Sequence, residues 1–277
     1  MNNNLMTLIK NIIYNRGRDI NYLIEKNIVN IDDITNAVID SGDLEYIYNF
    51  ACYIKGADIP KLENVIMKLG TAENIYYFAK YIKGANITKL ENAIINTNEA
   101  QYIYYFATDI KGANILKLED AIMNTNDAEY IYYFATDIKG TNISKLEDAI
   151  MNTKDARYIY YFARDVKGAD IPKLEDAIMN TNDAEYIYYF ARDVKGANIS
   201  KLEDVIIVLG DAQYIRLIKE YIERRKSKEY LFYLLKLVHN NDNKAIGKDK
   251  EEISDLFKEN NKSKTKVLIK DEKIDKK

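Results

Sequence analysis

Residues 183–210 read DAEYIYYFARDVKGANISKLEDVIIVLG, and this stretch decides the fold because it is repeated. The same pattern returns every 28 residues, without insertion or deletion, through six copies. A fixed period of between about 20 and 50 residues is typical of stacked repeat arrays. The six units are 43–70, 71–98, 99–126, 127–154, 155–182 and 183–210.

The first half of each unit predicts a helix. In the sixth unit we expect this helix to begin after an N-cap at Asn182, with Glu185 three positions later completing a capping box. A cation in the last turn, Lys195, and a glycine in the left-handed position after it, Gly196, are typical of a helix end. These signals predict a first helix of about 13 residues.

The second half of each unit predicts a shorter helix of about 10 residues. It opens at Asn198 in the sixth unit, and every copy has Asp or Asn at this N-cap position. The two prolines of the chain, Pro60 and Pro172, both fall in the first turn of such a helix, where the N–H that proline lacks has no helical partner. The six predicted caps are Asp58, Asn86, Asn114, Asn142, Asp170 and Asn198.

Both helices have an apolar face, and neither face can be covered within one unit. A two-helix hairpin of this size is too small to bury such an arc, so it must pack against copies of itself. The sequence therefore predicts an all-α fold, an αα solenoid of six helical hairpins, right- or left-handed. In the sixth unit the faces consist of Ala184, Ile187, Tyr188, Phe190, Ala191 and Val194, with Tyr186 at the margin, and of Ile199, Leu202, Val205, Ile206 and Leu209, while Lys201, Glu203 and Asp204 are expected in solvent.

The residues on either side of the repeats predict helical caps. Residues 1–42 contain a degraded copy of the pattern and are interpreted as an N-terminal helical cap. The pattern departs at Arg216, and residues 211–240 predict a longer helical pair that forms a C-terminal cap. Residues 241–277 are dense in charge of both signs and poor in aromatic residues, which predicts a mostly disordered tail.

The strings YIYYFARDVKGANI and KLEDAI resemble those of uncharacterised repeat proteins from AT-rich bacteria and their viruses, over residues 43–215. The arrangement is also similar in logic to tetratricopeptide and HEAT arrays, although the Trp-Gly-Tyr pattern of the former and the longer periods of both are absent. The resemblance implies a repeat fold and no particular activity.

Composition and charge exclude several classes of protein. The formal net charge is −3, which gives no whole-chain electrostatic case for binding nucleic acid or an anionic membrane. The single cysteine, Cys52, excludes an intramolecular disulfide framework. There is no signal-peptide pattern and no apolar run long enough to span a membrane. We therefore expect a cytoplasmic protein with no membrane association.

No constellation of residues predicts catalysis. The chain has one histidine, His239, and lacks the glycine-rich, zinc-peptidase and nucleophile-elbow motifs. Carboxylates recur in two columns that are copied with the repeat, whereas an active site is singular, so capping and solvation account for them. We therefore expect no enzymatic activity, no cofactor and no metal. The columns are Asp109, Asp137, Asp165 and Asp193, and Glu63, Glu91, Glu119, Glu147, Glu175 and Glu203.

The copies differ mostly along one side of their first helices. Substitutions concentrate at three positions of the polar arc, spaced i, i+7 and i+8, around a tyrosine that units two to six share. Tyrosine offers a large amphipathic contact area at low entropy cost, and solenoids bind along such faces, so this side is the candidate partner-binding surface. The tyrosines are Tyr77, Tyr105, Tyr133, Tyr161 and Tyr189, and the candidates beside them are Glu129, Arg157, Arg164, Asp165, Glu185, Arg192 and Asp193.

Several interpretations of this surface remain open. In one interpretation these positions vary only because they face solvent, and the surface has no function. In the functional interpretation, which we favour, the surface binds a protein or peptide partner. A repeating polymer, such as a polysaccharide or single-stranded nucleic acid, is the runner-up, although the aspartate column would repel phosphates and makes nucleic acid the less favoured. A purely structural spacer is the third interpretation. A second tyrosine column falls inside the apolar arc and is expected to be packed: Tyr76, Tyr104, Tyr132, Tyr160 and Tyr188.

Overall fold

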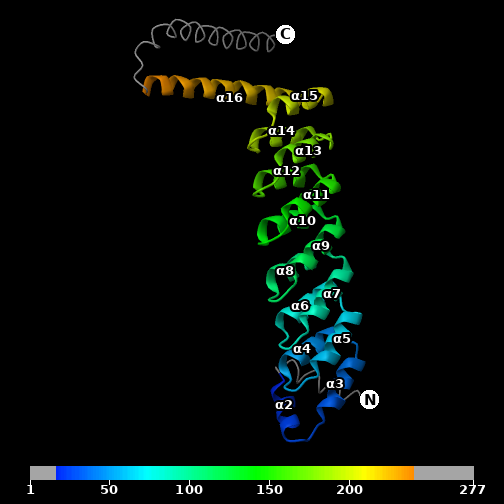
Figure 1. Ribbon diagram of the computed structural model, residues 1–277. Coiled ribbons are helices and arrows are strands. Elements are labelled where there is room, and N and C mark those ends of the chain that lie inside the picture. Colours follow the sequence, from blue (N-terminus) through cyan, green and yellow to red (C-terminus); the bar gives the residue numbers. More distant parts are fainter. Residues whose placement is uncertain (1–16, 240–277) are drawn as a thin grey trace, which may run out of the picture. The chain divides into compact units, whose positions relative to one another are not determined.

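The structure is a computed structural model that describes residues 17–239 (Figure 1). All regular secondary structure in this range is α-helical, which confirms the predicted class, and the chain divides after Asp211 into two compact parts. The first part contains α2 (Arg18–Glu25), α3 (Ile31–Asp40), α4 (Leu44–Tyr53), α5 (Ile59–Leu69), α6 (Ala72–Tyr81), α7 (Ile87–Thr97), α8 (Ala100–Asp109), α9 (Ile115–Thr125), α10 (Ala128–Asp137), α11 (Ile143–Thr153), α12 (Ala156–Asp165), α13 (Ile171–Met179), α14 (Ala184–Asp193) and α15 (Ile199–Leu209), and the second contains α16 (Ala212–His239).

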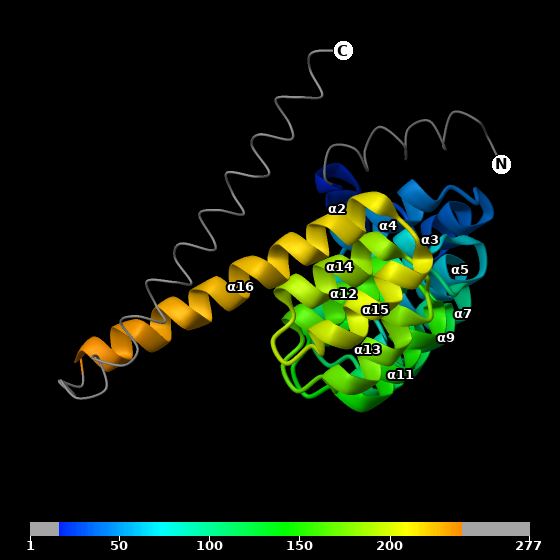
Figure 2. The ribbon, with the colours of Figure 1, turned by 90° about the horizontal axis from the view of Figure 1, so that it is seen from above.

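Helices α4 to α15 form the six units, two helices to a unit. Each first helix packs on its neighbours in the array: α12 contacts α10 and α14 as well as its own partner α13. The second helices stack in the same way, with α11 against α9 and α13. The predicted stacking of hairpins is therefore confirmed. In Figure 2 the second helices from α5 to α11 follow one another around the rim of the array, so the stack is twisted rather than flat.

The core repeats with the units. One phenylalanine of each first helix and one leucine of each second helix are fully buried, as Phe134 and Leu146 are in the fourth unit. Burying a side chain of this size contributes about 1.5–3 kcal/mol relative to leaving it exposed. In the last unit Ile199, Val205 and Leu209 are only partly buried. The full columns are Phe50, Phe78, Phe106, Phe134, Phe162 and Phe190, and Leu62, Leu90, Leu118, Leu146, Leu174 and Leu202.

The first helices begin one residue later than predicted. The N-cap of α14 is Asp183, whose side chain accepts hydrogen bonds from the N–H groups of Glu185 and Tyr186. Asn182 instead has a φ of 58°, in the left-handed region that asparagine tolerates better than most residues. The predicted capping box is therefore wrong, because one carboxylate already serves both orphan donors.

The first helices also end earlier than predicted. Helix α14 ends at Asp193 after 10 residues, because Val194 is extended. The next residues form a turn in which the N–H of Ala197 donates to the carbonyl of Val194 at 3.3 Å. Gly196, with a φ of 95°, occupies the third place of this turn, where a type II turn requires a positive φ. The glycine therefore shapes the hairpin turn and does not end the helix.

The second helices begin as predicted. Helix α15 has 11 residues, and the Asn198 side chain accepts a hydrogen bond from the N–H of Lys201. The Asp or Asn of every other unit caps its helix in the same way. Pro60 and Pro172 lie in the first turns of α5 and α13.

One continuous helix, α16, replaces the helical pair predicted over 211–240. The stretch from Ala212 to His239 contains no glycine or proline that would break a helix. Two ion pairs at i,i+4 spacing, Arg224 with Glu220 and Arg225 with Glu229, support it. Helices α2 and α3 lie in the region predicted as the N-terminal cap, and the predicted tail lies outside the described residues.

Candidate functional site

The tyrosines of the first helices form a continuous series of aromatic contacts across the units. At the junction of units four and five, the ring centroid of Tyr132 lies 5.6 Å from that of Tyr133, 6.0 Å from that of Tyr158 and 5.9 Å from that of Tyr161. Tilted rings at these separations attract one another. Equivalent contacts join the other units from two to six. We call this series the tyrosine ladder; its outer column is Tyr77, Tyr105, Tyr133, Tyr161 and Tyr189, its inner column is Tyr76, Tyr104, Tyr132, Tyr160 and Tyr188, and Tyr102, Tyr130, Tyr158 and Tyr186 complete it.

The two columns differ in exposure. The inner column is packed, as predicted: Tyr76 and Tyr160 are each 4% exposed, and no member is more than partly exposed. The outer column is half-buried beneath its aromatic neighbours, and Tyr77, at 40%, is its most exposed member. A partner would therefore meet tyrosine rings that already pack against other rings.

The inner hydroxyls bond each of units two to five to the unit that follows it. The Tyr132 hydroxyl donates to Asp165 of the following unit at 2.8 Å, and the Tyr160 hydroxyl donates to Asp193 at 2.7 Å. The Tyr104 hydroxyl likewise donates to Asp137 of the unit that follows it, at 2.6 Å. Burial, and then the bond to Asp165, raises the pKa of Tyr132 to about 12. The aspartate column, including the candidates Asp165 and Asp193, thus contributes to the junctions between units.

Two candidate arginines brace the same contacts. Arg164 donates two hydrogen bonds to Asp165, at 2.7 and 2.6 Å, and its guanidinium lies 4.9 Å from the centroid of Tyr161. The Arg164 guanidinium is the main cause of the lowered pKa of Asp165. Arg192 repeats this arrangement in the sixth unit with Asp193. Bidentate pairs of this kind fix geometry as well as charge.

The remaining candidates contact other tyrosines of the ladder. Glu129 accepts a hydrogen bond from the Tyr133 hydroxyl at 3.0 Å, and Glu185 does the same for Tyr189 at 2.9 Å. In the fifth unit this position is Arg157, whose guanidinium lies 4.5 Å from the ring centroid of Tyr158. The structure therefore brings every sequence-predicted candidate onto or beside the tyrosine ladder.

The sequence predicted that the glutamate column is solvated, and this prediction was wrong. The five glutamates that precede another unit are buried, with Glu119 only 1% exposed. The Glu119 carboxylate accepts a hydrogen bond from the N–H of Asn142, the helix cap of the next unit, at 2.7 Å. The same bond joins Glu63 to Asn86, and its equivalents occur at each later junction. Glu203 has no following hairpin and is partly exposed. The signal for this role was the absence of any substitution in the column.

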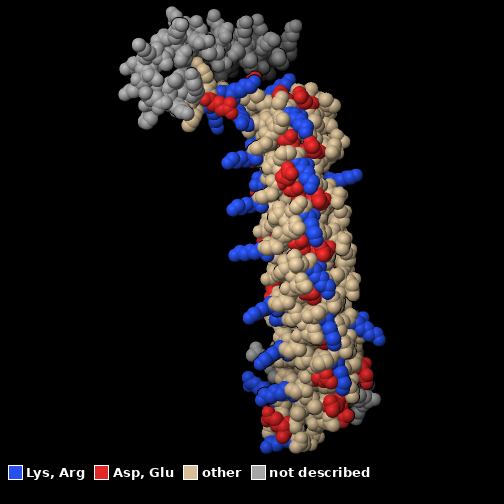
Figure 3. Space-filling model, in the orientation of Figure 1, with Lys and Arg blue, Asp and Glu red and all other residues tan. Residues whose placement is uncertain are grey.

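A third set of ties runs along the second helices. Lys145 forms an ion pair with Asp120 of the preceding unit at 3.2 Å, and Lys173 bonds Asp148 and lies 3.4 Å from Glu147. In Figure 3 acidic and basic side chains alternate in a band along the array. Exposed pairs of this kind contribute about 0.2–1 kcal/mol each.

The junction of units one and two lacks most of these ties. Tyr81 stands where later units have aspartate, so the Tyr48 hydroxyl has no carboxylate at that position. Asn74 replaces the tyrosine that would meet Tyr48, and a hollow of about 390 Å³ opens there, lined in part by Tyr48, Asn74, Tyr77 and Tyr81. Burial, and the neighbouring Cys52, raise the pKa of Tyr48.

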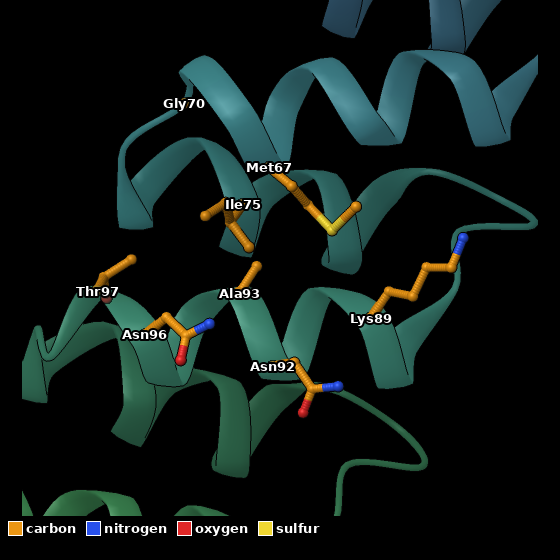
Figure 4. A pocket seen from close by; sticks show the side chains of 8 residues that line it. All are labelled: Met67, Gly70, Ile75, Lys89, Asn92, Ala93, Asn96 and Thr97. Atoms are coloured by element: carbon orange, nitrogen blue, oxygen red, sulfur yellow. The ribbon is translucent and has the colours of Figure 1, made fainter.

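A second hollow, of about 500 Å³, lies at the same junction on the side of the second helices. Met67, Ile75 and Ala93 give it an apolar floor. Figure 4 shows the side chains of Lys89 and Asn96 spread along α7 rather than converging on one point. It therefore offers no organised set of groups for a ligand.

The described part of the chain has few groups that could bind a metal ion or act as a nucleophile. Residues 17–239 contain no cluster of metal-ligating side chains, and none of their helices is long and apolar enough to cross a membrane. Partial burial raises the pKa of the Cys52 thiol, which keeps it protonated near neutral pH.

No family model, curated protein or solved structure matches the chain.

Proposed function

We propose that the array is a non-enzymatic cytoplasmic scaffold that binds another protein along the outer column of the tyrosine ladder. The observation that carries the proposal is the fixed geometry of this column. The ring of Tyr133 is held by Tyr104, Tyr130 and Tyr132, and its hydroxyl is held by Glu129. A surface that is already ordered loses little entropy on binding, and tyrosine is enriched among the residues that dominate binding energy.

The charge beside the column favours a protein over a repeating polymer. The residue four positions before the outer tyrosine is Gln101, Glu129, Arg157 and Glu185 in units three to six. A polymer of identical subunits is best matched by identical sites, whereas a protein surface can complement a sequence of different ones. A polysaccharide or single-stranded nucleic acid is therefore the alternative, and a spacer without a partner is the third.

The test exchanges charges that the array already tolerates. Glu129→Arg combined with Arg157→Glu leaves net charge unchanged, and each new residue already occurs at that position in another unit. The matched control, Asp120→Lys with Lys145→Asp, makes the same exchange on the second helices, where the two side chains pair. Both variants and the parent chain are immobilised and used to capture proteins from extract of the native host.

The proposal expects a captured protein that is retained by the parent and the control and weakened about fivefold or more by the face exchange. Identical capture by all three chains would contradict it. A further variant deletes residues 99–126 in frame and so removes one unit. Ligand binding that falls in proportion to the number of units would favour the polymer. No partner in any arm would favour the spacer.

A further inference from the structure

A second surface of the array is a row of lysines whose ammonium groups form almost no hydrogen bonds or ion pairs among the described residues. One lysine per unit occupies the second place of the turn between the two helices, and all six are exposed. Lys55 lies 3.5 Å from Glu25. Among residues 17–239, no carboxylate lies within ion-pair distance of the other five. We call these five the lysine edge: Lys83, Lys111, Lys139, Lys167 and Lys195.

The fold does not require lysine at this place. The second residue of a type II turn accepts many residue types, and proline is favoured there. A cation just after the C-terminus of a helix interacts favourably with the helix dipole, but arginine would do so equally well. The residue at the position of Gln101 and Arg157, which are both exposed, changes from unit to unit, whereas this lysine is present in every copy. The constancy of a side chain whose ammonium group forms almost no hydrogen bonds or ion pairs with the described residues points to a role outside the array.

The charge of the lysine edge is not cancelled by its surroundings. The nearest recurring carboxylates in sequence lie two residues earlier, and three of the four are held by their own cations: Asp109 by Lys80, Asp165 by Arg164 and Asp193 by Arg192. Figure 3 shows basic side chains projecting at regular intervals along one edge of the array. This edge is therefore electropositive although the whole chain carries a net charge of −3.

The shape of the row selects the kind of partner. The stack is twisted in Figure 2, so a partner that follows the row must follow that twist. Packed helices lie about 8–10 Å apart, which is close to three residues of an extended peptide. In units three to six an aspartate, not an aromatic ring, stands two residues before the lysine, so nucleotide bases have no stacking platform beside it.

We propose that the lysine edge binds an extended acidic polypeptide segment with a carboxylate at about every third residue. Each unit then presents one ammonium group to one carboxylate, and the segment follows the twist of the array. This surface is separate from the tyrosine ladder, and the proposal stands whether or not the outer column has a partner.

The probes are a synthetic peptide of about 20 residues with glutamate at every third place between glycine and serine, and an isomer with all its glutamates in one block. Oligothymidylate tests nucleic acid, and vesicles of phosphatidylcholine with one-third phosphatidylserine test a membrane. Binding to the full chain is measured at about 50 mM and about 200 mM salt.

Three variants make the test specific. Replacing Lys111, Lys139, Lys167 and Lys195 by glutamine removes four charges from the edge, and replacing them by arginine keeps the charges. The matched control replaces the four lysines that already pair with the preceding unit, Lys117, Lys145, Lys173 and Lys201, by glutamine.

The spaced peptide is expected to bind the parent, the arginine variant and the matched control, and to bind the edge-glutamine variant at least about fivefold more weakly, because each exposed ion pair contributes a factor of about 1.5–5. Equal weakening in the edge and control variants would overturn the proposal, as would no binding of the spaced peptide, or tighter binding of the block isomer, oligothymidylate or vesicles. The Glu129→Arg, Arg157→Glu chain should still bind the peptide, which separates this outcome from that of the tyrosine face.

Discussion

The junction of units four and five and the junction of units one and two both stack one helical hairpin on the next, but they differ in their side chains. At the first, Tyr132 contacts two rings and an aspartate of the next unit. At the second, Glu63 still bonds the helix cap of the next unit, but Asn74 and Tyr81 replace the ring and the carboxylate. Two hollows open at this junction. The comparison shows that buried apolar residues and one glutamate are enough to stack two hairpins. The polar face adds ring contacts and a hydrogen bond between the units.

The largest effect is expected from the glutamate that both kinds of junction share. Glu119→Ala removes a buried carboxylate and leaves the N–H of Asn142 without its acceptor, and we expect it to lower the free energy of unfolding by about 2–4 kcal/mol. Glu203→Ala makes the same change in the last unit, where no hairpin follows, and should cost less than about 0.5 kcal/mol. Urea unfolding followed by circular dichroism measures both. Equal losses would show that the glutamate acts within its own unit.

The irregular junction can be repaired by two substitutions. Asn74→Tyr with Tyr81→Asp supplies the missing ring and carboxylate, and should raise the free energy of unfolding by about 1–2 kcal/mol. The reverse pair, Tyr102→Asn with Asp109→Tyr, gives the junction of units two and three the irregular side chains and should lower it by a similar amount. Thermal unfolding of the two variants compares them directly. Asn74→Tyr also removes the capping box that Asn74 forms with Thr71, so a repair that destabilises would mean that the lost cap outweighs the added ring and carboxylate.

The inner hydroxyls should contribute a smaller amount. Tyr132→Phe keeps the ring and removes the bond to Asp165, which predicts a loss of about 0.5–1.5 kcal/mol. Tyr48→Phe at the irregular junction removes a hydroxyl that has no aspartate partner and should change stability by less than about 0.5 kcal/mol. If the two substitutions have the same effect, the tyrosine–aspartate bond does not stabilise the junction.

The regular junctions should also respond to alkaline pH. The folded pKa of Tyr132 and of Tyr158 is raised to about 12, above the ordinary value of 10.0. A group whose folded pKa is raised stabilises the fold below its unfolded pKa, and this stability is lost as pH rises through the folded pKa. Stability should therefore be full below pH 10 and fall toward pH 12. Tyrosinate absorbance gives the titration, and Tyr132→Phe should flatten the fall; an unchanged profile would count against this cause.

The repeat, the stacking and the apolar faces could be predicted from sequence because they depend on periodicity and on the size of one hairpin. The helix limits were less certain, since Asn182 and Asp183 are both good capping residues and only the backbone conformation distinguishes them. The sequence indicated the two tyrosine columns, but it did not indicate the hydrogen bonds between the units. Contacts such as Tyr132 with Asp165 span 33 residues, and a sequence shows the two columns without showing which units they join.

Native-state hydrogen exchange of the full chain tests the central claim, that the polar face of the hairpins joins unit to unit, most directly. The account predicts that backbone amides of α8 to α13, which lie between regular junctions, exchange slowest and together. Amides of α4 and α5, joined to the rest across the irregular junction, should exchange faster, and the Asn74→Tyr, Tyr81→Asp repair should slow them. Equal protection of α4, α5 and the central helices, unaffected by the repair, would contradict the claim.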